Sequence, residues 1–120
     1  MPLPCGTHWL RGDYAFTVDG TILAGPSPIL LRGVSMTRFD GAGNLSQVDF
    51  VTNNGPPVSR DWRPATGRYQ VNPDCTGSAE IIRNDGSPDL HLRMVVFDRG
   101  AQIRTVVIGG ATGSHGVRVQ

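Results

Sequence analysis

Apolar and polar residues alternate one by one along several segments of this chain, and this period of two constrains the fold more than any other feature. In residues 13–19, the larger side chains of Tyr14, Phe16 and Val18 occupy every second position. Successive side chains of an extended strand point to opposite faces, so the pattern predicts a strand with one apolar face. No stretch keeps a helical period. The sequence therefore predicts an all-β protein.

Turn-forming residues divide the chain into many short segments. The 120 residues include 16 Gly and 9 Pro, which suit turns because Gly tolerates positive φ and Pro offers no amide hydrogen to a sheet. Residues 58–63 are expected to form a short edge-like segment, and residues 21–24 are a candidate start of a partner strand. The remaining predicted strands are 13–19, 29–39, 45–52, 67–71, 78–83, 90–97, 102–108 and 117–119.

About eight antiparallel strands in sequence order can close on themselves, with residues 117–119 pairing against the first strand. An eight-stranded barrel has an interior that side chains fill or that holds one small ligand. We therefore predict that residues 1–120 form a single domain, a small closed antiparallel β-barrel. A sandwich of two sheets requires the same pattern and remains the alternative.

Charge and hydropathy argue against several classes of partner. The net charge is +1 without any run of like charges, which disfavours nucleic acid. All 11 basic residues are Arg, so no lysine is present for Schiff-base chemistry. No apolar stretch reaches the roughly 20 residues that span a bilayer, and residues 1–4 lack the features of a signal peptide. As given, the chain is expected to be soluble and cytoplasmic, unless a leader has been removed.

The only two cysteines, Cys5 and Cys75, lie far apart in the sequence. They show no metal-ligand spacing with each other or with the histidines, and no lysine or helix follows the glycine-rich residues 109–113, so neither a metal nor a cofactor is expected. A disulfide that closes so long a loop would be worth about 4 kcal/mol in the chain-entropy model. A bridged pair would favour an exported protein, while two free thiols fit the sequence equally well.

The hairpin between 29–39 and 45–52 aims polar residues at the predicted interior. If Phe39 and Leu45 share a face, the alternation places Gln47 and Asp49 on that face as well. Desolvation would raise the pKa of a buried Asp49, which makes it a candidate catalytic acid or base, with Gln47 as a candidate ligand contact. The alternative is that Asp49 caps a turn or faces water.

Aromatic residues supply further candidates. Tyr69 is a candidate catalytic residue because its phenol could reach the interior, and Tyr14 and Phe16 are candidate ligand contacts on the same kind of apolar stripe. The alternative is that both tyrosines are core residues whose hydroxyls reach the rim. Trp62 is either a ligand-contacting lid at the barrel mouth or a loop residue packed on an arginine stem.

Both faces of residues 90–97 are largely apolar. One parity turns Met94 inward as a candidate ligand contact and His91 outward, whereas the opposite parity would make His91 a candidate catalytic residue. With Met94 inward, Val95 and Phe97 lie on the outer surface. An apolar outer surface of this kind favours a homodimer.

Residues 10–16, 39–45 and 67–77 carry the sequences LRGDYAF, FDGAGNL and GRYQVNPDCTG. These stretches resemble a family of small bacterial proteins that are similar to allene oxide cyclase-like barrels, within the lipocalin-like (calycin-like) folds. The resemblance implies a barrel, cofactor-free isomerase or cyclase activity where such barrels serve biosynthetic pathways, and export for many bacterial members. It carries no catalytic motif that can be transferred residue by residue.

These observations lead to one functional expectation and two alternatives. The leading expectation is a barrel that encloses a hydrophobic small molecule and acts as a cofactor-independent isomerase or cyclase on an intermediate of secondary metabolism. A dry, shaped cavity can fold a flexible substrate toward its transition state without a recognisable motif. The alternatives are a non-catalytic exported lipocalin-like ligand-binding protein and a structural or interaction domain with a filled interior.

Overall fold

Eight strands and two short 3-10 helices make up the computed structural model, which describes residues 4–23 and 25–120. The helices are η1 (Thr7–Trp9), before the first strand, and η2 (Asp98–Gly100), between the sixth and the seventh. No helix in the described ranges is long and apolar enough to cross a membrane. The strands are β1 (Arg11–Ile22), β2 (Ile29–Asp40), β3 (Asn44–Asn53), β4 (Arg63–Val71), β5 (Thr76–Ile82), β6 (Leu90–Phe97), β7 (Gln102–Val107) and β8 (Ala111–Arg118).

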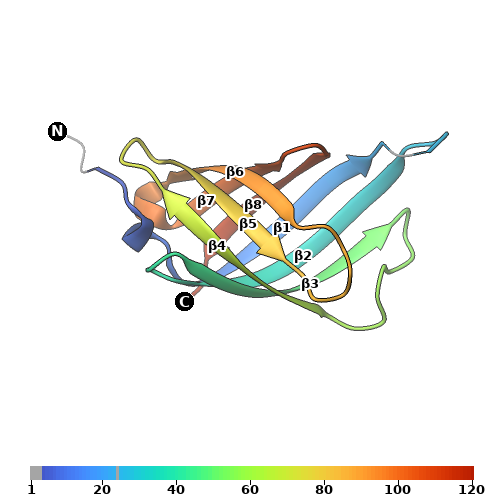
Figure 1. The fold of residues 1–120 in the computed structure, drawn as a ribbon, viewed down its shortest axis with the longest axis horizontal. Coiled ribbons are helices and arrows are strands. Elements are labelled where there is room, and N and C mark those ends of the chain that lie inside the picture. The colour runs from blue at the N-terminus through green and yellow to red at the C-terminus, as the bar shows by residue number, and fades with distance from the viewer. Residues whose placement is uncertain (1–3, 24) are drawn as a thin grey trace.

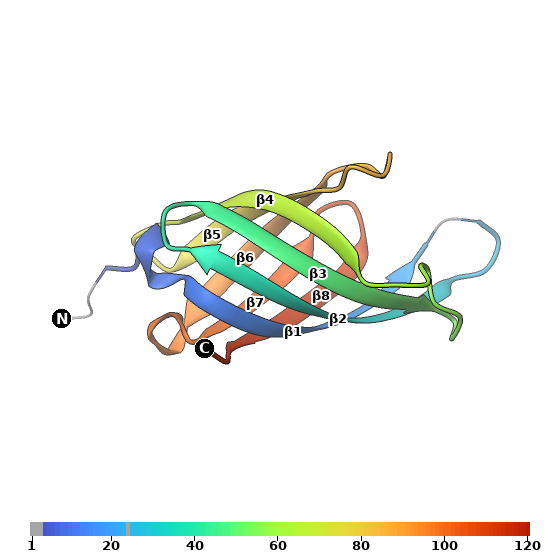
Figure 2. The ribbon, with the colours of Figure 1, turned by 90° about the horizontal axis from the view of Figure 1, so that it is seen from below.

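The strands close into a barrel. Each strand pairs antiparallel with the next one in sequence, and β8 returns to pair with β1 (Figure 1). The closing register runs from Tyr14 opposite Arg118 to Thr21 opposite Ala111. Figure 2 shows the same tube from below. The prediction of a small closed antiparallel barrel is therefore confirmed, and the sandwich alternative is wrong.

Residues 58–63 form no edge strand, contrary to the prediction. β4 begins only at Arg63, and the preceding loop makes an isolated bridge between Thr52 and Pro57. Pro57 and the proline before it lack amide hydrogens, so this loop cannot continue a ladder. Arg63 therefore lies on a paired strand, directly opposite Asp49.

The first and last strands are longer than predicted. The segment 21–24 starts no partner strand where the structure describes it, since β1 runs through its first two residues; Ala24 lies outside the described residues. β8 begins well before the predicted 117–119. Its glycine content has a packing reason: a Cβ at Gly116 would overlap the ring of Phe16. A glycine at position 116 thus leaves room for the Phe16 side chain of β1.

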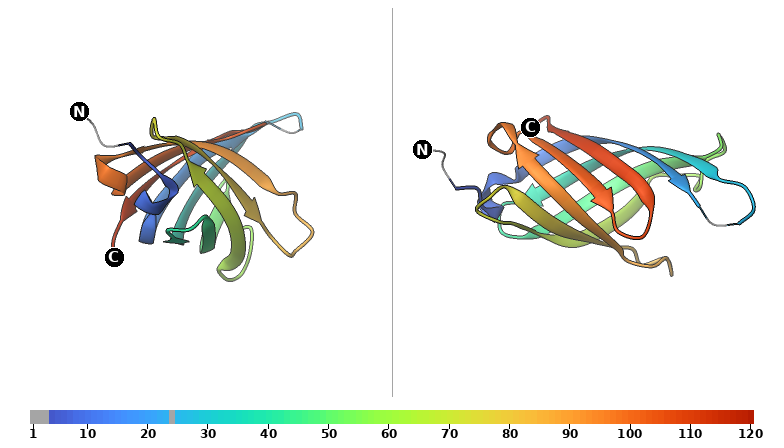
Figure 3. Two further views of the ribbon diagram at one scale, coloured as in Figure 1. Left: turned by 60° about the vertical axis from the view of Figure 1, so that its left-hand side comes forward. Right: turned by 90° about the horizontal axis from the view of Figure 1, so that it is seen from above.

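An aromatic core closes one end of the barrel. Phe39 makes edge-to-face contacts with Tyr14 and Tyr69, with ring centroids 5.1 and 4.9 Å apart. The N-terminal segment crosses this end with η1, as Figure 3 shows, and adds the fully buried side chain of Leu10 to the core. We call this the closed end. The β1–β2 hairpin extends beyond the opposite end.

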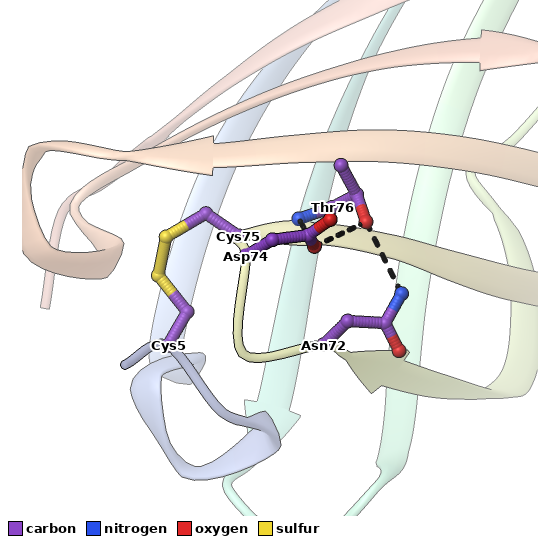
Figure 4. The surroundings of a disulfide bond; sticks show 5 residues. All are labelled: Cys5, Asn72, Asp74, Cys75 and Thr76. Carbon is purple, nitrogen blue, oxygen red and sulfur yellow. Dashed lines mark hydrogen bonds between the residues drawn. A yellow bond between two sulfur atoms is a disulfide. The ribbon is translucent and has the colours of Figure 1, made fainter. Parts of the chain in front are cut away.

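A disulfide between Cys5 and Cys75 fastens the N-terminal segment to the turn between β4 and β5 (Figure 4). The amide of Cys5 also donates to the carbonyl oxygen of Pro73 at 3.0 Å. Within the turn, the Thr76 amide and hydroxyl both donate to Asp74 Oδ1, at 3.0 and 2.6 Å. The question that the sequence left open is therefore resolved in favour of a bridge.

Candidate functional site

A cavity of about 200 Å³ occupies the part of the barrel away from the closed end, and it opens to solvent. Its walls are mainly apolar, with aliphatic side chains such as Val18, Leu31, Val51, Leu92 and Val107. These residues lie on five different strands, and each points inward through the alternation of its own strand. The interior is therefore not completely filled by side chains.

One charged cluster interrupts this apolar lining. Asp49 of β3, Arg63 of β4 and Arg83, which directly follows β5, all line the cavity. Asp49 Oδ1 accepts from Arg63 Nε at 3.0 Å. Asp49 Oδ2 accepts from Arg63 Nη2 at 3.4 Å and from Arg83 Nη2. Both carboxylate oxygens are thus bound by guanidinium groups.

The cluster is shielded from water and carries excess positive charge. The side chains of Asp49 and Arg83 are each 7% exposed, and that of Arg63 is 22% exposed. Two guanidinium groups face one carboxylate, so the cluster has one net positive charge. Among the described residues, Arg83 Nη1 has no hydrogen-bond partner, although the atom is buried.

Strand register explains how these residues meet. Asp49 lies opposite Ser35 on one side and opposite Arg63 on the other. Directly opposite residues of an antiparallel pair point to the same face, so the Arg63 fork meets the carboxylate from the neighbouring strand. A row of polar side chains continues inside the barrel from there, with the Thr37 hydroxyl donating to Gln47 Oε1 at 3.0 Å.

The opposite wall carries a second, neutral polar pair. Thr105 of β7 and Ser114 of β8 lie opposite each other and share a hydrogen bond of 2.6 Å between their hydroxyls. Both residues line the cavity.

In the part of the chain that the structure describes, no group of three His, Cys, Asp or Glu side chains is placed to hold a metal ion. The chemistry available to a guest is therefore apolar contact, hydroxyl groups and the arginine cluster.

The predicted site residues divide between the cavity, the closed end and the outer surface. Phe16, Gln47, Asp49 and Met94 line the cavity. Trp62 is 54% exposed, and its ring packs beside Phe50 with centroids 5.8 Å apart. His91 is exposed, with Nδ1 3.5 Å from Oε2 of the equally outward Glu80. His91 and Trp62 therefore do not line this cavity.

The two tyrosines predicted at the site lie at the closed end, outside the cavity lining. Tyr69 donates to the Leu10 carbonyl at 2.8 Å and accepts from the Gly41 amide at 2.8 Å. Tyr14 donates to the Gly100 carbonyl and accepts from Arg118 Nη2 at 2.7 Å. Burial raises the pKa of both phenols above the ordinary value. Their hydroxyls hold the N-terminal segment and the η2 turn onto the barrel.

Arg63 and Arg83 were missed by the reasoning from sequence. For Arg83 a signal existed, because the alternation that turns Ala79 and Ile81 inward also turns residue 83 inward. For Arg63 the sequence gives no comparable signal, because it lies at the end of the predicted edge segment 58–63. Arginines that flank an aromatic residue resemble ordinary solvated loop charges until the strand boundary is known.

Comparison with family models, curated proteins and solved structures found no match. The similarity to allene oxide cyclase-like barrels therefore stays a prediction. The closed eight-stranded antiparallel barrel, which is compatible with a lipocalin-like fold, rests on the strand pairing described above.

Proposed function

We propose that the protein is a ligand-binding barrel that holds a small apolar organic molecule in the half opposite the closed end. The observation that carries this proposal is the cavity of about 200 Å³, which is lined mainly by aliphatic and aromatic side chains and opens to solvent. Concave apolar sites with a few polar groups are the usual binding sites for small molecules. Moving apolar surface of a guest out of water contributes about 25 cal/mol per Å².

The volume limits the guest. An apolar cavity of about 150 Å³ holds one benzene molecule, so the cavity here suits an apolar portion of about eight to ten non-hydrogen atoms. Longer molecules would extend through the opening. Octanoate and 1-octanol, which differ only in their polar group, are suitable probes of this size.

The disulfide supports binding outside the reducing cytoplasm. Cys5 and Cys75 are bridged, and disulfides persist mainly in oxidising compartments. This favours the exported, non-catalytic, lipocalin-like alternative. Binding alone also needs no free general base, and both oxygens of Asp49 are already engaged by arginines.

A cofactor-independent isomerase or cyclase of the allene oxide cyclase-like kind is the second candidate. It is favoured by the Asp49 cluster, because fixed charges beside a water-poor cavity can stabilise charge that develops in a transition state. The two candidates share the same cavity. Turnover of a bound polyunsaturated or epoxide-bearing compound, followed by mass spectrometry, would distinguish the enzyme from the carrier.

Two matched variants on β7 test binding in the cavity. Val107 lines the cavity, whereas the neighbouring Val106 points outward and is 58% exposed. We expect wild type to bind 1-octanol or octanoate in a one-to-one complex by titration calorimetry. Val107→Trp should abolish binding by filling the cavity, and Val106→Trp should leave it unchanged. Absence of binding of both probes by wild type, or undiminished binding by a folded Val107→Trp protein, would overturn the proposal.

A further inference from the structure

The charged cluster carries an inference about the guest, which rests on the proposed function. We propose that the natural ligand is an amphipathic monoanion, an apolar chain or ring with one carboxylate, and that this carboxylate binds Arg83 with support from Arg63. The structure shows the cluster on the cavity wall.

The first observation is the net positive charge of the cluster. Asp49, Arg63 and Arg83 are the charged side chains of the cavity lining as far as the structure describes it. Removing a charge from water is costly unless an opposite charge accompanies it. Here Asp49 can neutralise only one of the two guanidinium groups. A ligand with one negative charge would complete the neutralisation.

The second observation is an unused donor. Arg83 Nη2 donates to Asp49, but Arg83 Nη1 is buried and has no hydrogen-bond partner among the described residues. Only 7% of the Arg83 side chain is exposed. A buried donor on a charged group that lacks an acceptor costs more than a hydrogen bond is normally worth. Because Nη1 is buried, the guanidinium group would have to turn toward the cavity for a ligand oxygen to accept from it, and that contact would remove this cost.

Asp85 is the neighbouring acid that could compete for Arg83. It lies in the exposed β5–β6 loop, and its Oδ1 accepts from the Ser87 amide at 2.9 Å. Hydrogen bonds from Ser87 are the main cause that lowers the pKa of Asp85, ahead of the charge of Arg83, and no ion pair within 4.0 Å joins Arg83 and Asp85 among the described residues. Asp85 therefore does not occupy the donor that Nη1 presents.

The chemistry of the donors selects a carboxylate and an orientation. A guanidinium is a planar fork that matches the two oxygens of a carboxylate. The cluster lies where β4 begins and β5 ends, which is the open end of the barrel. The carboxylate would therefore sit near the opening, with the apolar portion directed toward the interior aromatic residues Phe16 and Phe39, which also line the cavity.

The decisive experiment compares octanoate with 1-octanol at neutral pH and low salt, using titration calorimetry on the oxidised wild-type protein. We expect octanoate to bind about 10- to 100-fold more tightly, as for a hydrogen bond to a charged group. In Arg83→Gln the two affinities should become similar, because the preference for octanoate is lost. Arg104→Gln, which removes an exposed arginine from the outer face of β7, should keep the preference.

Each outcome is informative. Equal affinities of wild type for the two probes would overturn the charge inference while leaving the proposed function intact. A preference for octanoate that persists in Arg83→Gln would also overturn it, with retained 1-octanol binding as the sign that the variant is folded. If Arg83→Gln does not fold, the comparison in wild type decides by itself. Failure to bind either probe would overturn the proposed function and not only its ligand class.

Discussion

Removal of the Cys5–Cys75 bridge should destabilise the barrel strongly without unfolding the cavity. The bridge joins residues separated by 70 positions. In the chain-entropy model, a cross-link over a loop of that length restricts the unfolded chain by about 4 kcal/mol. Domains of this size are typically stable by only about 5–15 kcal/mol in total. The bridge therefore accounts for a substantial part of the free energy of unfolding.

Noncovalent contacts at the closed end should survive reduction. The Cys5 amide bonds to Pro73, the Thr7 hydroxyl accepts from the Val71 amide at 3.2 Å, and the Tyr69 hydroxyl bonds to Leu10. Because these contacts hold the same segment, the native state should change little, and the loss should arise mainly from a less constrained unfolded state.

Urea denaturation followed by tryptophan fluorescence measures the effect. We expect the free energy of unfolding to fall by about 4 kcal/mol in the double variant Cys5→Ser/Cys75→Ser, or in wild type under reductant. The same reductant should leave the double variant unchanged, which controls for effects unrelated to the bridge. A decrease below about 1 kcal/mol would show that the bridge does not restrict the unfolded chain. Probe binding should persist, since the cavity lies toward the other end.

Two further predictions concern packing and pH. Gly116→Val should cost about 1–3 kcal/mol, because its side chain would overlap the Phe16 ring. Gly110→Ala, whose added methyl would lie 3.9 Å from the nearest atom, Val107 Cγ1, should stay within about 0.5 kcal/mol of wild type in the same urea assay. An unchanged midpoint for Gly116→Val would contradict this packing. Burial raises the pKa of Tyr14 and Tyr69, so their contribution to stability is complete below the ordinary tyrosine pKa of about 10 and is lost as the pH rises above it. Tyr69→Phe should therefore lose less stability than wild type as the pH rises above about 10. Ultraviolet absorbance follows the ionisation of the phenols in the native protein. If both phenols ionise at their ordinary pKa, the prediction is wrong.

Sequence alternation predicts which face a side chain occupies, and here it did so well. The face shared by Phe39 and Leu45 does carry Asp49, which is 5% exposed. Residues 90–97 form a strand with the predicted bounds, and Met94 is buried inside. These results follow from local geometry, since the two faces of a strand differ by a single residue step.

Alternation does not predict how far along the barrel axis a side chain lies. For this reason the predicted site residues are divided between the cavity, the closed end and the outer surface. Tyr14 and Phe16 share an inward face, yet Tyr14 lies in the closed end and Phe16 lines the cavity. Height depends on the stagger between strands, which the pattern within one strand does not contain. The pairing of Asp49 with Arg63 and Arg83 likewise requires the register of three strands. The homodimer and the catalytic roles stay predictions.

The arrangement of the chain ends has a practical consequence. The Gln120 carbonyl accepts from the Asp13 amide at 3.2 Å near the start of β1, so Gln120 lies at the closed end of the barrel (Figure 1). A linker fused after Gln120 would leave the molecule at the closed end. Copies tethered to a surface through such a linker would all turn the opposite end of the barrel, where the cavity opens, toward the solvent.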